Sequence, residues 1–517
     1  MAALNGRPAH GQAGGGGPWE RRSMARPVRL VLPHQLFAEH LDVPRGTVLV
    51  LVEHDLLVRQ YAFHAQKLVL HRAGMRRFAE RLRAAGHDVE VVESRADRSS
   101  HDGLVALLRR LRPTGVSVVD VVDDWLGRDL SAALEEAGHR LRPDEVLESP
   151  GFLTTRRQLV DALGGSRSRA RMQHFYAWQR RRLDVLVDGD EPAGGRWSFD
   201  EENRRSLPAH VVVPAVPPVA ERRHSEVEAA ISWVRDEFPD APGDPDAFAW
   251  PTSHEEAAES FEVFLDERFG LFGPYEDAIS AHHDTLFHSR LTPSLNTGLV
   301  SPAHVVERVL EVAERDGVPL PTVEGFVRQV IGWREYMRGT YHLWGRRLRT
   351  GNRLGHTRPL APGWWDATTG LEPVDLVVRR VLDNGWAHHI ERLMVLGNAM
   401  TLLRTDPDDA YRWFMEMFVD AYDWVMVPNV YAMSQFAAGE AVTTKPYVSG
   451  SAYLRRMSDI PAGPWTAEWD ALYWTFVRDH ADVLGRNARS RVITQAYDRM
   501  APATKAGHTR RAAAWLS

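Results

Sequence analysis

Cysteine is absent from this chain of 517 residues. Its absence excludes disulfides, thiolate zinc sites, a cysteine nucleophile and any cysteine-ligated iron-sulfur cluster. Because disulfides belong to oxidising compartments, a chain without cysteine favours a cytoplasmic location. The sequence also lacks any stretch approaching about 20 consecutive apolar residues, the length that spans a bilayer. We therefore expect no contact with a membrane.

Neither sign of charge dominates. The chain has 69 acidic and 63 basic residues and a net charge of -6, which argues against a uniformly basic nucleic-acid coat but allows a local basic groove. Its 44% hydrophobic and 26% charged residues indicate an ordinary globular protein, long enough for two or three domains. Residues 1–26, with "GQAGGGG" and several arginines, are interpreted as a disordered extension without the apolar region of a secretion signal.

Residues 27–150 alternate short Val/Leu-rich runs with longer helical patterns. The expected strands are "VRLVL", "TVLVLVE", "DVEVVES", "VSVVDVVDD" and "DEVLES". Strands separated by helices pair in parallel and are buried on both faces. This pattern predicts a doubly wound α/β domain with a parallel sheet. The dinucleotide fingerprint G-x-G-x-x-G is missing, because "LPHQLF" follows the first strand.

The remaining chain divides into a connector and a helical half. Residues 151–250 are punctuated by Gly and Pro, in "PAGGRWSFDEENRR" and "VVVPAVPPVAERR", and predict a long interdomain connector with some helix. After Pro251 the strand signal disappears, and helical periods with Trp, Met and Leu run to about Arg499. Residues 251–517 are therefore predicted to form an all-α domain.

Two adjacent histidines, His388 and His389, lie in the apolar pattern "GWAHHIERLMVLGNAM". On an unbroken helix His389 flanks the apolar stripe centred on Trp386, whereas His388 points to nearly the opposite side. Zinc-binding helices place histidines four residues apart, but Arg392 stands four residues after His388. This geometry predicts no metal ion. Each histidine alone remains either a buried neutral imidazole or a proton donor facing a cavity.

A phosphate site is one interpretation of "LFHSRLTPSLNTGLVSP". Ser289, Arg290 and Thr292 lie just ahead of Pro293 and a helical pattern. Hydroxyls, a guanidinium and a helix N-terminus together suit an anionic phosphate. The alternative is an ordinary helix cap.

Arginines alternate with aromatic residues in "EGFVRQVIGWREYMRGTYHLWGRRLRTGNR", residues 324–353. This pattern suits phosphate contact combined with base stacking. The alternative is a solvated basic helix face with a buried aromatic side.

Two polar residues near residue 425 also need an explanation. Asp423 lies among apolar residues and needs a partner if it is buried, for which Arg392 is a candidate. Asn429 follows Pro428 in an expected non-helical break. Its amide either faces a ligand or forms a structural turn.

Together these stretches resemble the photolyase/cryptochrome superfamily, specifically its bacterial branch of iron-sulfur cryptochromes and (6-4) photolyases. The resemblance covers most of the chain after Val28 and rests on many blocks in order: "KLVLHRAGMRRFAERL", "GGRWSFDEENR", "FGPYEDA", "LFHSRLTPSLNTGL", "IGWREYMRG", "AHHIERLMVLGN", "PNVYAMSQFA", "TTKPYVSGSAYLRRMSD" and "DALYW". It implies an N-terminal α/β domain, a connector and a C-terminal helical domain that binds FAD.

The resemblance also implies roles for matched residues. The loop implied to bind the FAD phosphates consists of Ser289, Arg290, Leu291 and Thr292, with Tyr275 nearby. Asn429 is implied to face flavin N5, and Arg392 is implied to pair with Asp423 beside the isoalloxazine ring. Met433 and Tyr447 would line a lesion pocket. Trp365, Trp413 and Tyr422 resemble the chain that passes electrons to photoexcited flavin, with Phe414 where Tyr is often found.

The implied function is light-dependent repair of (6-4) pyrimidine-pyrimidone photoproducts in UV-damaged DNA. The lesion would flip into the flavin cavity, excited reduced FAD would donate an electron, and His389, beside His388, would give a proton to the lesion. Leu393 occupies the position where eukaryotic relatives have a second histidine. Two alternatives are a cryptochrome-type blue-light receptor without repair activity and a flavin-free nucleic-acid-binding remnant. We expect a monomer.

Two departures from the family are informative. The sequences "EP" at Glu372–Pro373 and "IPAGPWTAEWD" at residues 460–470 stand where cluster-ligating cysteines are expected, so the chain is predicted to bind FAD without an iron-sulfur cluster. His34 and Leu57 occupy the positions of acidic residues that bind a lumazine antenna. These replacements argue against that antenna, although another chromophore could occupy the crevice.

Overall fold

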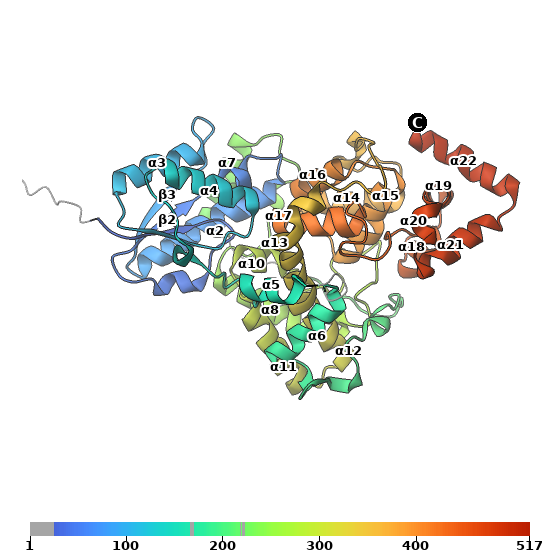
Figure 1. Cartoon of the computed structure of the whole chain (residues 1–517), viewed down its shortest axis with the longest axis horizontal. Coiled ribbons are helices and arrows are strands. Elements are labelled where there is room, and N and C mark those ends of the chain that lie inside the picture. Colours follow the sequence, from blue (N-terminus) through green and yellow to red (C-terminus); the bar gives the residue numbers. More distant parts are fainter. Residues whose placement is uncertain (1–24, 166–169, 218, 220–222) are drawn as a thin grey trace, which may run out of the picture.

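The computed structural model describes residues 25–165, 170–217, 219 and 223–517. The expected extension at residues 1–26 lies outside the described residues as far as residue 24. An α/β domain forms one end of an elongated molecule, and the last helices of the chain form the other (Figure 1). Among the described residues, no helix is long and apolar enough to cross a membrane.

The predicted parallel sheet is confirmed. Its strands are β1 (Val28–Val31), β2 (Val48–Val52), β3 (Asp88–Val92), β4 (Val116–Val119) and β5 (Val146–Leu147), in the order β3-β2-β1-β4-β5. Alternate residues of β2 enter different cores: Val48 and Val50 pack in one, and Leu49 and Leu51 pack in the other. This division explains the continuous apolar run, because both faces of the sheet are covered. The helices of this domain are α1 (Asp55–Val58), α2 (Ala65–Ala84), α3 (Ser100–Leu111) and α4 (Asp124–Glu136).

The strand order reverses between β1 and β4, the position at which open α/β sheets form a crevice. His34 follows β1 in this crevice, and its Nε2 lies 3.2 Å from the carbonyl oxygen of Val121. Its ring lies 5.7 Å from that of Tyr422 in the helical half. Burial lowers the pKa of His34 to about 4, so the side chain is neutral at pH 7. The predicted absence of a lumazine antenna from this crevice, and the binding of any other chromophore there, both stay predictions.

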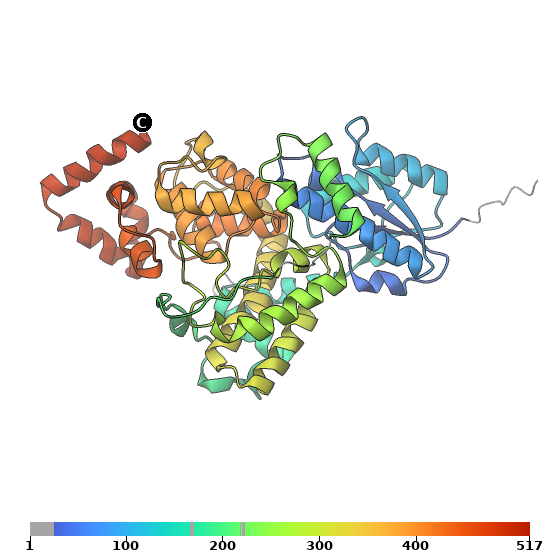
Figure 2. The ribbon, with the colours of Figure 1, turned by 180° about the vertical axis from the view of Figure 1, so that it is seen from behind.

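The connector contacts both halves of the molecule. It contains α5 (Arg156–Leu163), α6 (Met172–Leu183), the hairpin β6 (Val187–Asp188) and β7 (Glu191–Pro192), and α7 (Ser225–Glu237). Helix α7 packs beside α2 on the α/β domain, as Figure 2 shows from behind, whereas α6 packs on the helical half. The domain boundaries at residues 150 and 250 stay a prediction.

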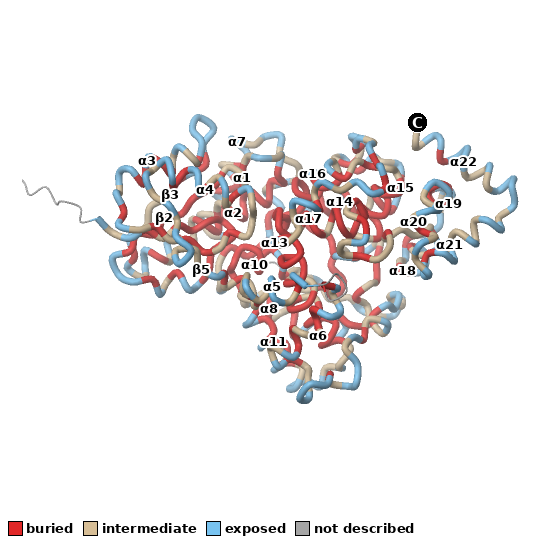
Figure 3. Tube along the Cα trace, viewed as in Figure 1, coloured by how far each residue is buried: buried red, intermediate tan, exposed pale blue. Residues whose placement is uncertain are grey.

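The C-terminal half is helical, as expected. Its helices are α8 (His254–Glu267), α9 (Phe269–Phe272), α10 (Thr292–Thr297), α11 (Pro302–Asp316), α12 (Leu320–Val327), α13 (Glu335–Arg349), α14 (Glu372–Asn384), α15 (Asn398–Leu402), α16 (Pro407–Met417), α17 (Asp423–Val427), α18 (Ser451–Met457), α19 (Pro464–Asp479), α20 (Ala481–Gly485), α21 (Ala488–Asp498) and α22 (Pro502–Leu516). Buried residues extend through both halves and become sparse in α21 and α22 (Figure 3).

Three π-helical segments interrupt this half, at Arg328–Arg334, Glu391–Gly397 and Pro428–Ser434. Wide turns of this kind are rare and occur often at functional sites. The second and third pack together closely, because a Cβ atom on Gly397 would lie 2.2 Å from Ser434 Oγ. Asn429 therefore lies in a π-helical segment that continues α17, and the non-helical break expected there is wrong.

The helix expected across residues 385–400 begins only at His389. Gly385 adopts a left-handed conformation with φ of 66° and ends α14. Residues 386–388 are not helical. The assumption of an unbroken helix through both histidines is therefore wrong.

The arginines of residues 324–353 are divided between the interior and the surface, so neither interpretation describes the whole stretch. Arg338 is buried and pairs with Asp120, whereas Arg328 is buried between acidic residues that include Asp200. Arg346, Arg347 and Arg353 are exposed. The segment mainly joins the connector and both domains and does not present a continuous basic surface.

Tryptophans pack in the segment where the resemblance implies cluster cysteines. Trp465 and Trp469 are almost completely buried, with ring centroids 6.2 Å apart. Trp465 Nε1 donates a hydrogen bond to the carbonyl oxygen of Pro461 at 3.0 Å. A Cβ atom on Gly463 would lie 3.4 Å from Glu372 Oε2, so the two segments implied by the resemblance do meet.

Candidate active site

Arg392 forms a bidentate ion pair with Asp420. Its Nη1 and Nη2 atoms lie 2.8 and 3.0 Å from the two carboxylate oxygens of Asp420. The guanidinium also lies 4.1 Å from the centroid of the Phe418 ring. The expected pairing of Arg392 with Asp423 is therefore wrong. Asp420 belongs to the turn before α17, whereas Asp423 is the first residue of that helix.

Asp420 also anchors the loop predicted to bind phosphate. Thr292 Oγ1 donates to Asp420 Oδ2 at 2.6 Å, and Asn296 Nδ2 donates to the carbonyl oxygen of Asp420 at 2.9 Å. Within the loop, Ser289 Oγ accepts a hydrogen bond from the backbone N–H of Leu291 at 3.3 Å. One carboxylate thus joins the predicted phosphate loop to the predicted flavin arginine.

Arg290 and Tyr275 lie apart from the Asp420 network. The guanidinium of Arg290 stacks 4.3 Å from the ring centroid of Trp250. Burial lowers the pKa of Arg290 to about 10, which leaves it charged at pH 7. Tyr275 packs against Phe287, with ring centroids 5.6 Å apart. Phosphate binding by Arg290 and Tyr275 stays a prediction.

Asn429 lies on the π-helical segment that packs beside the one carrying Arg392. Its Nδ2 donates to the carbonyl oxygen of Val425 at 2.8 Å. This bond leaves Oδ1 as the acceptor that a protonated ring nitrogen needs. Its position opposite flavin N5 stays a prediction.

Asp423 belongs to a different network at the contact with the α/β domain. Its carboxylate accepts hydrogen bonds from the hydroxyls of Tyr341 and Tyr411 and pairs with Arg349. Tyr341 also accepts a bond from the backbone N–H of Asp124 at 3.0 Å. Burial and then the charge of Asp423 raise the pKa of Asp123, at the start of α4, to about 7.

Three histidines converge beside this region, contrary to the expectation for His388 and His389. The rings of His288 and His388 stack with centroids 4.6 Å apart and planes 9° apart. The ring of His389 meets that of His288 at 5.5 Å and 80°. The convergence is possible because Gly385 ends α14 and the helix starts again only at His389, so the helical separation of the two rings does not apply.

The three histidines differ in their exposure. His288 and His388 are buried, and desolvation holds the pKa of each well below its usual range. The side chain of His389 is 42% exposed. Its Nε2 lies 3.9 Å from a carboxylate oxygen of Glu276 and 3.8 Å from one of Asp277. His389 is therefore the accessible member of the three.

Two buried glutamates support this cluster. Glu391 accepts a hydrogen bond from Arg380 at 2.5 Å, and its second oxygen lies 3.5 Å from His388 Nε2. Burial raises the pKa of Glu391 to about 7. Glu276 accepts bonds from Asn203 of the connector and from Gln329, at 3.0 and 2.5 Å. The connector thus reaches the edge of the histidine cluster.

Two family models match the chain. Residues 29–250 match "Deoxyribodipyrimidine photo-lyase-related protein", and residues 327–463 match "FAD binding domain of DNA photolyase". A (6-4) photolyase of Agrobacterium fabrum is 31% identical over 466 residues, which cover 88% of this chain and 91% of that protein. The chain belongs to the photolyase/cryptochrome superfamily.

Other members of the superfamily share the fold at lower identity. A bacterial class III photolyase of Agrobacterium tumefaciens superimposes with a TM-score of 0.54 and 17% identity, over 85% of this chain and 88% of that one. A cryptochrome of Synechocystis gives a TM-score of 0.54 and 13% identity, over 93% of each chain. The α/β domain followed by a helical domain is thus the superfamily architecture.

The residues present fit the FAD of this superfamily. A fixed guanidinium at Arg392, an amide oxygen at Asn429 and hydroxyls at Ser289 and Thr292 lie on segments joined through Asp420. Such donors and acceptors are those that tune and orient a flavin. The buried Nε atom of Arg290 has no hydrogen-bond partner among the described residues, so one further donor remains available.

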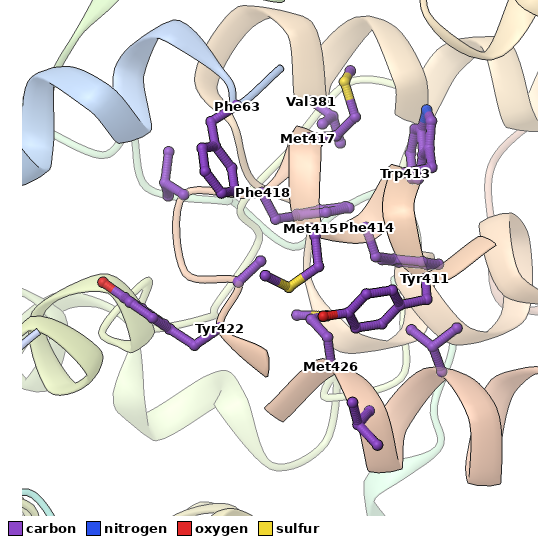
Figure 4. Close-up of a cluster of buried hydrophobic side chains, with 14 of the residues drawn as sticks. Phe63, Val381, Tyr411, Trp413, Phe414, Met415, Met417, Phe418, Tyr422 and Met426 are labelled. Atoms are coloured by element: carbon purple, nitrogen blue, oxygen red, sulfur yellow. The ribbon is translucent and has the colours of Figure 1, made fainter. Parts of the chain in front are cut away.

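The predicted electron-transfer residues of this superfamily member do not form one continuous stack. Trp413 is buried against Trp364, 5.5 Å between centroids, and against Phe414 and Phe418 at 5.3 and 5.8 Å. Phe418 in turn contacts Arg392. Tyr422 lies on the other side of the cluster (Figure 4), where its hydroxyl is 2.8 Å from His71 Nε2.

Trp365 is half-buried, and its Nε1 donates to Glu416 at 3.1 Å. It lies beside Trp364 in sequence, at the outer end of the path that leads through Trp413 to Phe418. The path would run from Trp365 at the surface through Trp364 and Trp413 to Phe418. Electron transfer along it stays a prediction.

The predicted lesion-pocket residues share one apolar cluster. Met433 belongs to it, and Tyr447, Leu393 and Trp333 pack against it. Burial raises the pKa of Tyr447, and the charge of Asp200 raises it further. Leu393 packs against this cluster and follows His389 by about one helical turn in the same helical stretch, so the apolar cluster and the accessible histidine lie near each other.

Sequence reasoning missed Asp420, His288, Glu391 and Phe418. The segment "FVDAYDWVM" contains two aspartates, and the pattern alone does not distinguish which of them pairs with Arg392. His288 directly precedes Ser289 in "LFHSRL", and its adjacency to the loop was the available signal. The sequence carries no comparable signal for Phe418, because apolar packing alone explains an aromatic residue there.

Proposed function

We propose that this protein uses light to repair (6-4) pyrimidine-pyrimidone photoproducts in UV-damaged DNA, with FAD as the electron donor. The observation that carries the proposal is the position of His389: half-exposed, flanked by two carboxylates and close to an apolar cluster. The identity of 31% to a (6-4) photolyase over most of the chain supports it.

FAD, when bound, would supply the light-driven electron. Arg392 would keep a positive charge at the ring, because Asp420 and Phe418 fix its guanidinium from two sides. Asn429 would accept a hydrogen bond through Oδ1. Its amide group is held in place because Nδ2 already donates to the carbonyl oxygen of Val425. Thr292 would hold the phosphate loop against Asp420.

His389 would donate the proton to the lesion. The carboxylates of Glu276 and Asp277 lie close enough to orient the imidazole from one side, and the edge of the His288 ring confines it from another. A proton on an exposed, oriented imidazole is what general acid catalysis requires. Met433 and Tyr447 would contact the flipped bases through apolar surface.

Repair assays on both lesion types would test the proposal. Fully reduced protein under blue light should restore thymines from (6-4) photoproducts and leave cyclobutane dimers unchanged. Intact (6-4) lesions after illumination would contradict the proposal. Light-driven reduction of FAD without any repair would favour the alternative of a cryptochrome-type receptor.

The variant His389→Ala tests the proton donor. We expect it to bind FAD normally and to lose repair by about 100-fold or more, the contribution of a general acid. His283→Ala is a matched control, because His283 is also exposed and follows another histidine. Repair at the wild-type rate by His389→Ala would show that the proton comes from elsewhere.

A further inference from the structure

The cluster of His288, His388 and His389 has the donors of a metal site. One nitrogen from each ring lies within 4.8 Å of the others. A tetrahedral zinc ion holds its nitrogen ligands about 2.0–2.1 Å away, hence about 3.3 Å from one another. Binding therefore requires the rings to turn about their side-chain torsions and close this gap.

The buried rings are short of hydrogen-bond partners. His288 Nε2 and both nitrogens of His388 have none among the described residues. Buried polar atoms without a partner are uncommon in folded proteins, since each costs the free energy of its lost hydration. A cation bound between the rings would give a partner to one nitrogen of each.

The carboxylate of Glu391 lies beside the ring of His388. Imidazoles that bind a metal usually have such a carboxylate next to their other nitrogen. Glu391 Oε2 has no hydrogen-bond partner among the described residues and lies 3.5 Å from His388 Nε2. Arg380 fixes the other oxygen of Glu391. A carboxylate that accepts one imidazole N–H orients the ring and makes its other nitrogen a better ligand.

We propose that His288, His388 and His389 form a binding site for one divalent cation of the zinc class. Imidazole nitrogens favour Zn²⁺, Co²⁺ and Ni²⁺, whereas Mg²⁺ and Ca²⁺ prefer oxygen ligands. Three protein ligands with one half-exposed member leave a coordination position open towards solvent. The site therefore resembles an exchangeable zinc site and not a closed structural one.

Occupancy would have a consequence for repair, which rests on the proposed function. A cation bound to His389 takes the nitrogen lone pair that would otherwise hold the proton. The metal-loaded protein should then repair more slowly while photoreduction of FAD continues. The cation would act as a reversible inhibitor at the lesion pocket.

Binding can be measured without any repair assay. Tag-free protein with oxidised FAD, stripped with a chelator, would be titrated with Co²⁺ in the dark and followed by the cobalt absorption beyond the flavin bands. We expect one Co²⁺ per chain, displaced by Zn²⁺. His288→Gln and His389→Gln should each weaken binding by about tenfold or more, since loss of even an outer-shell partner of a metal ligand has an effect of this size.

Two variants serve as matched controls. His283→Gln removes an exposed histidine that follows His282. His356→Gln removes one of another histidine pair, whose Nε2 atoms lie 3.1 Å apart. Both should bind Co²⁺ like the wild type. Since His288 is buried, its variant is checked by FAD content and circular dichroism, and the half-exposed His389 provides the test if that variant misfolds.

No bound Co²⁺ or Zn²⁺ in the wild type, or equal binding by His389→Gln, would overturn the site. Loss of binding in His356→Gln alone would also overturn it, since the cation would then belong to the other pair. Protein that binds Co²⁺ at the three histidines but repairs nothing would contradict only the proposed function.

Discussion

Asp420 and Asp423 are three residues apart, yet they belong to two different regions of the molecule. Asp420 pairs with Arg392 and anchors Thr292, next to the predicted flavin ring. Asp423 binds two tyrosine hydroxyls and Arg349 where the helical half meets the α/β domain. The first carboxylate arranges the predicted ligand site, and the second joins the helical half to the α/β domain.

The difference shows that charge and burial do not identify function on their own. Both carboxylates are almost completely buried and both accept several strong hydrogen bonds. They differ in the elements they join, since Asp420 connects a loop to a π-helical segment. Variants of the two regions should therefore separate stability from cofactor binding.

The largest effect is expected for Asp420→Ala. It leaves the guanidinium of Arg392 without its partner and frees Thr292, and breaking a buried ion pair in this way costs about 3–5 kcal/mol. We expect loss of bound FAD together with lower stability, measured by flavin absorbance and urea unfolding. Asp420→Asn keeps an acceptor for Thr292 and should lose less. Full FAD content in Asp420→Ala would contradict the role assigned to this carboxylate.

Asp423→Ala should destabilise the protein by about 2–4 kcal/mol, because it leaves two buried hydroxyls and Arg349 without their acceptor. We expect its flavin spectrum and its repair rate per folded molecule to be unchanged. Urea unfolding and flavin content measured on the same sample check both statements. If FAD were lost as readily as in Asp420→Ala, the separation of the two regions would fail.

Gly397→Ala tests the packing between the two π-helical segments that carry Arg392 and Asn429. The new Cβ would lie 2.2 Å from Ser434 Oγ, and overpacking of this kind costs about 1–3 kcal/mol. Thermal unfolding should show a lower midpoint and weaker FAD retention. Gly507→Ala in α22 is the control, since a Cβ there meets nothing within 4 Å and should not destabilise. Equal midpoints for the two variants would contradict this account.

Asp123→Asn should give the smallest effect, visible as a pH dependence. The pKa of Asp123 is raised to about 7 in the folded protein. Above its unfolded pKa the folded state binds more protons, so this residue lowers stability as the pH rises from about 4 to 7. The variant keeps a side chain able to cap α4 and should gain stability relative to wild type between pH 5 and 8. A pH-independent difference in urea midpoints would contradict the assignment.

The sheet was predictable because each strand carries its own signal. Each of the five strands was expected from a local Val/Leu run, and parallel pairing followed from the helices between them. The candidate site depends on contacts between residues distant in sequence. Arg392 could pair with either aspartate by pattern alone, and only the folded chain shows that Asp420 is its partner.

The histidine pair shows a second reason why a site cannot be predicted from periodicity alone. The prediction assumed a continuous helix through His388 and His389, and a single left-handed residue, Gly385, shifts its start. One residue of displacement changes the direction of a side chain by about 100° on a helix. Periodicity therefore predicts an element well and the orientation of its first residues poorly.

The indole packing at Trp465 and Trp469 has a consequence for how the protein is made. Indole side chains of the chain itself fill the position at which the resemblance implies cluster ligands. Synthesis in a cell starved of iron, or exposed to oxidants that dismantle metal clusters, would still yield a complete polypeptide core at this position. Folding at this position therefore needs no cysteine-ligated cluster.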